Sequence, residues 1–157
     1  MQFRPFVVLA AGLALGACGG EKKPETPPAN PAPAAAPAGN PAPITGKTTV
    51  VNMVGDATGS RFEPATVTLK AGDGIRFDAI SGGPHNVSFD VASLSPEAKT
   101  ALVANMPSQD MGELSNKLIA DKESLTISFA NVPPGTYTVN CTPHMALQMK
   151  MTVTVQK

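Results

Sequence analysis

The residues best suited to metal chemistry stand close together near the end of the chain. Between Cys141 and Met149 the sequence contains a thiol, an imidazole at His144 and, at its end, a thioether. The chain has 2 histidines, and the other one, His85, lies far upstream. Thiolate, thioether and imidazole ligands together favour copper over magnesium or calcium. Two histidines and one cysteine with a weak axial methionine define a blue copper site, so the set predicts one copper ion held by His85, Cys141, His144 and Met149.

Alternation of apolar and polar residues on both sides of this loop predicts the strands that position it. Apolar side chains alternate over residues 137–141, before the loop, and over residues 149–155, after it. Similar short runs occur at residues 48–54, 66–70, 75–79, 87–89 and 125–129. About seven short strands separated by turns predict an all-β fold, a two-sheet antiparallel Greek-key sandwich.

One stretch, at about residues 95–120, departs from this pattern. Ser95, Pro96 and Glu97 form a helix start, with a capping hydroxyl, a proline at the first helical position and an early acid. We expect the helix to continue through Asn105 and to end before Pro107. Residues 108–120 are compatible with a second short helix or with an irregular flap, so the sequence predicts a short helical insertion in the sandwich.

The spacing Cys-x-x-His-x-x-x-x-Met, with Pro143 directly before the histidine, resembles the plastocyanin branch of the cupredoxins. The segment Gly83-Pro84-His85-Asn86-Val87 resembles the one that supplies the first histidine ligand. In that family the asparagine after this histidine braces the ligand loop, and the resemblance implies that role for Asn86. The resemblance to this family extends over about residues 48–156. It implies a one-electron carrier that is not an enzyme.

Three residues depart from the pattern of that family. Gln148 stands where a glycine usually precedes the axial methionine, and Met151 stands where a second glycine is common. Asn140 replaces the aromatic residue often found before the cysteine. None of these changes removes a ligand, but outer contacts tune such sites, so the reduction potential and the docking surface are left open.

An apolar rim around His144 is the expected docking surface for redox partners. The rim residues are Pro84, Pro143, Met145, Ala146 and Leu147. In cupredoxins the histidine of this loop usually lies nearest the surface, which implies that electrons pass through His144. Brief redox encounters use small interfaces, and a c-type cytochrome, an oxidase or a photosynthetic complex would each fit as partner. The protein itself is expected to be a monomer.

The beginning of the chain predicts export. A short positive start and an apolar run too short to span a bilayer end in Leu15-Gly16-Ala17-Cys18, which resembles the lipobox of bacterial lipoproteins. Residues 1–17 are therefore expected to be a signal peptide and Cys18 a lipid anchor at the cell envelope, in the outer membrane if the cell has two. An ordinary secretory signal is the alternative. With Cys18 lipidated, Cys141 has no cysteine left to pair with, and a metal would occupy its thiol.

A tether and one domain account for the remainder. Residues 18–44 comprise the anchor cysteine and a Pro/Ala-rich linker, a composition that favours extended polyproline-like conformations. Residues 45–157 form the predicted cupredoxin domain. The linker suits a tethered shuttle and equally a plain spacer.

Composition excludes some functions and leaves an alternative. The 12 basic and 12 acidic side chains cancel, and aromatic residues make up 4% of the chain, which argues against binding to nucleic acid. A copper-storing or copper-delivering protein is the main alternative, because thioethers favour Cu(I). Met53, Met106, Met111, Met145 and Met151 supply such groups, although they are scattered along the sequence.

Overall fold

The computed structural model describes residues 40–157. The signal peptide, Cys18 and most of the linker lie outside the described residues. The strands are β1 (Thr48–Asp56), β2 (Gly59–Glu63), β3 (Thr66–Lys70), β4 (Gly74–Ser81), β5 (Ser88–Phe89), β6 (Ser124–Ser128), β7 (Gly135–Asn140) and β8 (Lys150–Gln156). One α-helix, α1 (Pro96–Asn105), and two 3-10 helices, η1 (Val91–Ser93) and η2 (Thr142–Leu147), complete the elements. No helix of residues 40–157 is long and apolar enough to cross a membrane.

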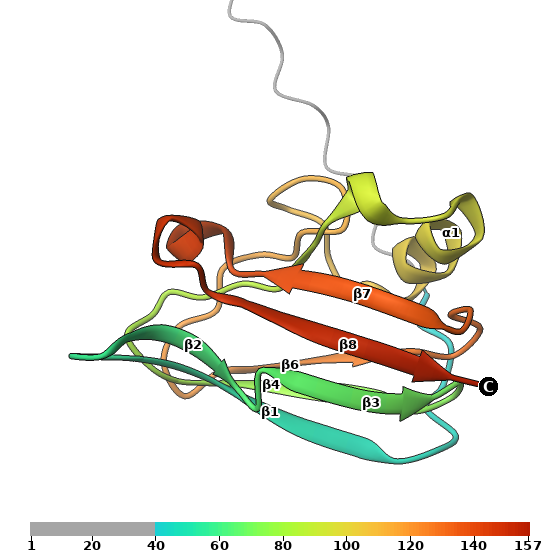
Figure 1. Ribbon diagram of the computed structural model, residues 1–157, viewed down its shortest axis with the longest axis horizontal. Helices are drawn as coiled ribbons and strands as arrows, with labels where there is room; N and C mark the ends of the chain where they lie inside the picture. The colour runs from blue at the N-terminus through green and yellow to red at the C-terminus, as the bar shows by residue number, and fades with distance from the viewer. Residues whose placement is uncertain (1–39) are drawn as a thin grey trace, which may run out of the picture. The chain divides into compact units, whose positions relative to one another are not determined.

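The strands form two sheets packed face to face (Figure 1). One sheet has the order β2-β1-β4-β6 and the other has the order β3-β8-β7-β5. The predicted all-β sandwich with a short helix is confirmed. The sheets are mixed rather than wholly antiparallel, because β1 pairs with β4 and β3 pairs with β8 in parallel. Alternation along a strand reports which face is buried and not the direction of the neighbouring strand, so the sequence did not reveal this.

The core lies between the two sheets and follows the alternation seen in the sequence. On β8, Met151, Val153 and Val155 are buried while Lys150 is exposed. The sheet face that carries them meets Phe62 and Phe77 of the other sheet's strands in one continuous apolar cluster. Burial of this kind stabilises the fold by about 25 cal/mol per Å² of apolar surface removed from water. The rigidity of this core fixes the strand ends, from which the loops with the chemically active residues leave.

Helix α1 begins as its sequence predicts. The Ser95 hydroxyl oxygen accepts a hydrogen bond from the Ala98 N–H at 3.2 Å, and Pro96 occupies the first turn. The helix ends at Asn105, before Pro107. Residues 106–120 form an irregular segment without a second helix. Of the two conformations that the sequence allowed for residues 108–120, a short helix or an irregular flap, the structure has the flap.

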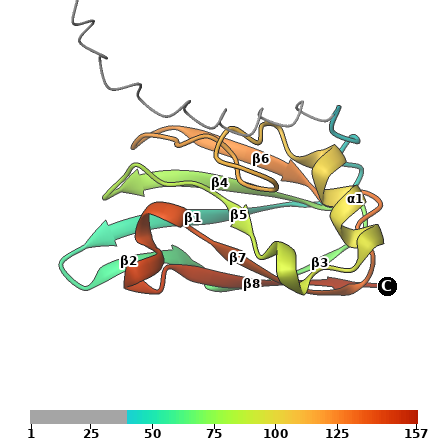
Figure 2. The same ribbon diagram turned by 90° about the horizontal axis from the view of Figure 1, so that it is seen from above.

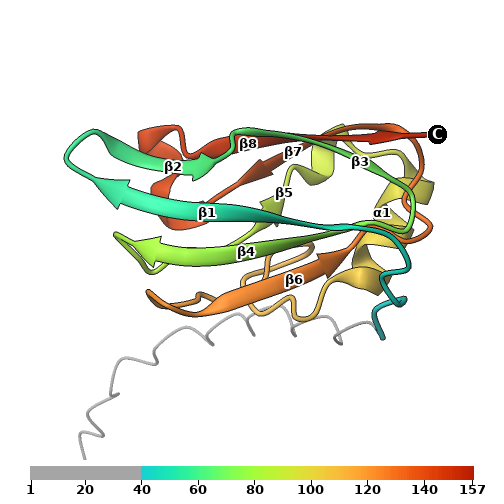
Figure 3. The ribbon, with the colours of Figure 1, turned by 90° about the horizontal axis from the view of Figure 1, so that it is seen from below.

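The loop between β7 and β8 and the first described residues lie at opposite ends of the sandwich (Figures 2 and 3). At one end, which we call the loop end, β7 stops at Asn140 opposite Lys150, and η2 joins the two strands. At the other end, the linker end, the first described residues attach to the domain. Thr45 and Gly46 both donate backbone N–H groups to the Gly72 carbonyl at 3.0 Å. The linker therefore enters the fold at the end far from η2.

Candidate metal centre

Cys141 and His144 are fixed by the strands on either side of their loop. The Cys141 N–H donates to the Met149 carbonyl at 3.0 Å, which continues the ladder between β7 and β8. The His144 N–H donates to the Cys141 carbonyl at 3.0 Å and so begins η2. This tight turn brings the imidazole back over the thiol, and the Cys141 Sγ lies 3.4 Å from the His144 Nδ1.

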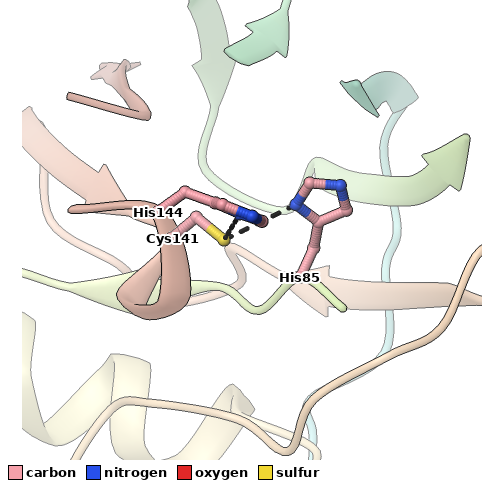
Figure 4. A group of neighbouring side chains, drawn as sticks. All are labelled: His85, Cys141 and His144. Carbon is pink, nitrogen blue, oxygen red and sulfur yellow. Dashed lines mark hydrogen bonds between the residues drawn. The ribbon is translucent and has the colours of Figure 1, made fainter. Parts of the chain in front are cut away.

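His85 reaches the same point from the segment before β5, although 56 residues separate it from Cys141. Its Nδ1 lies 3.6 Å from the Cys141 Sγ, and Figure 4 shows both imidazoles turned towards the sulfur. The ligand atoms of His85, Cys141 and His144 all lie within 4.8 Å of one another. The structure thus brings together three of the four residues predicted as ligands from two distant parts of the chain.

The hydrogen bond at the far side of the His85 ring decides its tautomer. The His85 Nε2 lies 2.9 Å from the Ser81 carbonyl oxygen, which can only accept. Nε2 therefore carries the proton, and the Nδ1 lone pair is free to point at the Cys141 sulfur. A histidine that binds a metal commonly donates its other ring N–H to such a partner, which orients the ring.

The spacing and type of these atoms fit one transition-metal ion. Imidazole nitrogen and thiolate sulfur bind an ion such as zinc at about 2.0–2.3 Å, which places the two ligand atoms roughly 3.5–3.8 Å apart at tetrahedral or trigonal angles. The 3.6 Å separation between the Cys141 sulfur and the His85 nitrogen falls in that range, and the 3.4 Å separation from the His144 nitrogen lies just below it. Two imidazoles and a thiolate without a second cysteine suit copper.

Burial makes the metal-free thiolate unfavourable. Cys141 is wholly buried, and this raises the pKa of its thiol, although main-chain N–H groups of Asn86 and His144 act in the opposite direction. The pKa of His144 is lowered, first by burial and then by its electrostatic interaction with the neighbouring His85, which favours the neutral imidazole that a metal requires. A bound cation would compensate the thiolate charge that the apolar surroundings cannot stabilise.

Met149 is held beside the other three residues by its main chain. Its carbonyl accepts from the Cys141 N–H, and its own N–H donates to the His144 carbonyl at 3.3 Å. The side chain is 1% exposed, immediately before β8. Its predicted role as the fourth ligand is consistent with this position and stays a prediction.

Asn86 links the two parts of the site, as the family resemblance implied. Its backbone N–H points at the Cys141 Sγ at 3.4 Å. Its side-chain Oδ1 accepts from the Thr142 N–H at 2.7 Å, directly after the cysteine. The same side chain donates to the Ser115 hydroxyl at 3.0 Å, a partner that the sequence did not indicate.

Two further features of the site were missed from the sequence. The irregular segment 106–120 supplies hydrogen-bond partners to the His85 segment through its buried polar residues Ser115 and Asn116, which no pattern in the sequence marked. Gln148 adopts a left-handed conformation, with φ 58° and ψ 30°. That conformation explains why glycine suits this position, since residues with a Cβ are strained there.

The predicted apolar rim is on the surface. All five of its residues, Pro84, Pro143, Met145, Ala146 and Leu147, are exposed. Met145 and Leu147 reach 55% and 58% exposure, which is high for large apolar side chains. His144 is partly exposed in the middle of the same loop.

The fold and the site define a cupredoxin, and comparison with known proteins gives the family. Residues 49–156 match the model of copper-binding proteins of the plastocyanin/azurin family. The chain is 34% identical over 106 residues to plastocyanin from the fern Dryopteris crassirhizoma, which covers 66% of this chain and 96% of the relative. It is 34% identical over 107 residues to plastocyanin from Ulva prolifera, covering 68% of this chain and 98% of that one.

A solved structure of a plastocyanin has the same fold. Oxidised plastocyanin from Dryopteris crassirhizoma superimposes with a TM-score of 0.55 at 32% identity, over 69% of this chain and all of the fern protein. The chain belongs to the plastocyanin/azurin family of copper-binding proteins.

Proposed function

We propose that this protein is an exported one-electron carrier whose single copper ion is held by His85, Cys141, His144 and Met149. The observation that carries the proposal is the convergence of two imidazole Nδ1 atoms on one buried thiol, at 3.4 and 3.6 Å. Copper bound there would supply exchange of one electron between Cu(I) and Cu(II). The chain's own contribution is to hold the ligands in place during that exchange.

The sandwich limits movement of the ligands because each is tied to main chain. His85 is fixed through its Nε2 proton and through main-chain bonds to Ile119 at 2.8 and 3.0 Å. Cys141 sits where β7 meets β8, and its sulfur faces the Asn86 N–H. A rigid ligand set has little to rearrange when charge changes, so electron exchange is fast. The completed set also leaves no obvious open position for a substrate, which agrees with a carrier and not an enzyme.

Exchange with partners is proposed to occur at the apolar rim. Weak redox encounters use small interfaces, and the exposed Met145 and Leu147 beside His144 offer an apolar contact. A pocket beside Met145 is bordered by Asp90 and Lys150, which carry opposite charges. A c-type cytochrome, an oxidase or a photosynthetic complex would fit as partner of a monomeric shuttle.

We further propose that the protein works outside the cytoplasm on a lipid anchor at Cys18. The Leu15-Gly16-Ala17-Cys18 segment and the Pro/Ala-rich linker support this. The attachment of residues 45 and 46 at the linker end is compatible with it, because a tether there leaves η2 uncovered.

Copper storage or delivery receives less support. Met53, Met106 and Met151 are at most 2% exposed and belong to the apolar core, so their thioethers cannot reach incoming copper. Met111 and Met145 are exposed at 46% and 55%. Reversible voltammetry and rapid reduction by a cytochrome distinguish the carrier from a protein that passes copper to an acceptor without redox turnover.

The site is tested by adding Cu(II) to the metal-free chain produced from residue 19 onward, which retains every described residue. We expect one equivalent to bind with an intense blue absorption that is lost in Cys141→Ser. Met151→Leu is the matched control, since it removes a buried sulfur from the same region without touching a ligand. A colourless product from the unaltered chain would contradict the proposal.

A further inference from the structure

The irregular segment between α1 and β6 acts as a pairing partner for the segment that carries His85. The His85 N–H donates to the Ile119 carbonyl at 3.0 Å, and the Ile119 N–H returns a bond to the His85 carbonyl at 2.8 Å. A second isolated bridge joins Ser88 to Ser115. Residues 85–88 are thus held between the ligand loop on one side and residues 115–119 on the other.

Asn116 holds the centre of this pairing. It is wholly buried, and its Oδ1 accepts from the Val87 N–H at 2.6 Å. Its backbone N–H donates to the Val87 carbonyl at 3.2 Å, while its Nδ2 donates to the Lys117 carbonyl at 2.7 Å. Asn116 therefore supplies the partners for both backbone groups of Val87, the residue after Asn86.

Ser115 and Asn116 also hold the Asn86 side chain. The Asn86 Nδ2 donates to the Ser115 hydroxyl at 3.0 Å and lies 3.4 Å from the Asn116 carbonyl. The opposite edge of the same amide accepts the Thr142 N–H. With its side chain held at both edges and its neighbours His85 and Val87 paired, the Asn86 peptide has little freedom to rotate. That peptide N–H is the one aimed at the Cys141 sulfur.

A hydrogen bond to a metal-bound thiolate changes the energy of the site. The sulfur carries more negative charge when the metal is reduced, and an N–H dipole pointing at it stabilises that state more. Small rotations matter because hydrogen bonds weaken steeply as they lose alignment. Residues that set the direction of the Asn86 N–H therefore influence the reduction potential without touching the metal.

We propose that Ser115 and Asn116 are positioning residues of the metal centre, which hold the Asn86 N–H against the Cys141 sulfur and so raise the reduction potential. The inference rests on the proposed function and assigns a role to the segment after α1. A purely structural role for these residues is the competing account.

The chain offers a matched control for that account. Asn105 is also a buried asparagine, 1% exposed, and it also links two main-chain segments, accepting from the Ala42 N–H and donating to the Ala130 carbonyl. It lies at the end of α1, near the linker end. Asn105→Leu and Asn116→Leu each remove a buried amide that hydrogen-bonds to main chain, but only Asn116→Leu does so beside the predicted ligands.

The test measures reduction potential and the sulfur-to-copper absorption of the copper-loaded chain from residue 19 onward. We expect Ser115→Ala and Asn116→Leu to lower the reduction potential. The electron-exchange equilibrium between the protein and a reference redox couple should shift three- to tenfold towards the oxidised protein, about 28–59 mV at 59 mV per tenfold. We expect Asn105→Leu to lower stability without this shift. Ser115→Thr keeps the hydroxyl and should restore the potential.

The outcomes separate the two accounts. Unchanged potentials and absorption in Ser115→Ala and Asn116→Leu, with stability lost as in Asn105→Leu, would overturn the inference. Ser115→Ala is the milder change and serves if Asn116→Leu fails to fold. If the unaltered chain binds no copper, the proposed function fails and with it the effect on reduction potential, and amide exchange at Asn86 in the metal-free protein decides whether Ser115 positions the Asn86 N–H. Faster exchange in Ser115→Ala and not in Asn105→Leu would support it, and equal exchange would refute it.

Discussion

Gln148 shows how a single residue can carry strain next to a binding site. It follows η2 in a left-handed conformation, and its N–H donates to the Met145 carbonyl at 2.9 Å to close the turn. A side chain with a Cβ is strained there by about 1 kcal/mol, whereas glycine is not. We therefore expect Gln148→Gly to stabilise the metal-free protein by about 0.5–1 kcal/mol in denaturant unfolding. Gln148→Ala keeps the Cβ and is the control, and an equal gain from both variants would show that strain is not the cause.

Met149 is predicted as the fourth ligand from the sequence. Its main-chain hydrogen bonds and its burial are consistent with that role. A thioether favours Cu(I) when compared with harder ligands, but compared with no ligand at all it stabilises the more highly charged Cu(II) more, so Met149→Leu should keep the blue colour and raise the reduction potential. A shift of at least about 59 mV, a tenfold change in equilibrium, is expected in voltammetry. Met151→Leu, one position beyond Lys150, should leave the potential unchanged. Equal potentials in both variants would remove Met149 from the ligand set.

At the scale of elements, the turn between β3 and β4 depends on the charge of Asp73. Its carboxylate accepts the Lys47 N–H at 2.7 Å and the Lys70 N–H at 2.9 Å, and these bonds lower the pKa of Asp73. A carboxyl whose folded pKa is lowered stabilises the fold above its unfolded pKa, about 3.9, and this contribution is lost as pH falls through the folded value.

Asp73→Asn should therefore destabilise the protein by about 1 kcal/mol at neutral pH, a figure kept small because the group is partly in solvent. The difference from the unaltered protein should shrink as pH falls through the lowered folded pKa of Asp73, where the carboxyl becomes protonated. Thermal unfolding across pH 2–7 measures this. A difference that stays constant with pH would show that the charge of Asp73 is not responsible.

The elements also show which parts of the architecture the sequence could predict. The helix start at Ser95 and the inward face of β8 follow from local patterns, a capping hydroxyl and strict alternation, and both were predicted. The parallel pairing of β1 with β4 and the contacts of Asn116 with Val87 depend on which distant segments meet. No local pattern encodes that, so they required the structure. The grouping of His85, Cys141 and His144 was predictable because metal chemistry restricts residue type and spacing together.

At the scale of the whole molecule, the entry of the linker and the exposed rim lie at opposite ends of the sandwich. The strand β8 runs from Lys150, opposite Asn140 at the loop end, to Gln156, opposite Lys70 at the linker end. At about 3.3 Å per residue, its 7 residues span roughly 20 Å. The linker enters beside Gly72, so the exposed rim of Met145 and Leu147 lies at the far end from the tether.

Lipid attachment at Cys18 would then hold the protein at a membrane without covering its docking surface. We expect the lipidated protein to sediment with membranes and Cys18→Ser to be soluble, while both show the same blue absorption, because the ligand thiol is Cys141. Recovery of both forms in the soluble fraction would refute the anchor.

The rate of electron exchange tests the orientation separately. With copper bound, the lipidated protein on vesicles and the soluble Cys18→Ser protein should reduce a small inorganic oxidant at rates that agree within about twofold, because diffusion to the rim is unobstructed in both. Stopped-flow growth of the blue colour, as the copper of the initially reduced protein is oxidised to Cu(II), measures this, with neutral lipid used so that surface charge does not alter the oxidant concentration. A rate on vesicles lower by tenfold or more would mean that the loop end faces the bilayer, which the entry of the linker at the opposite end of the sandwich argues against.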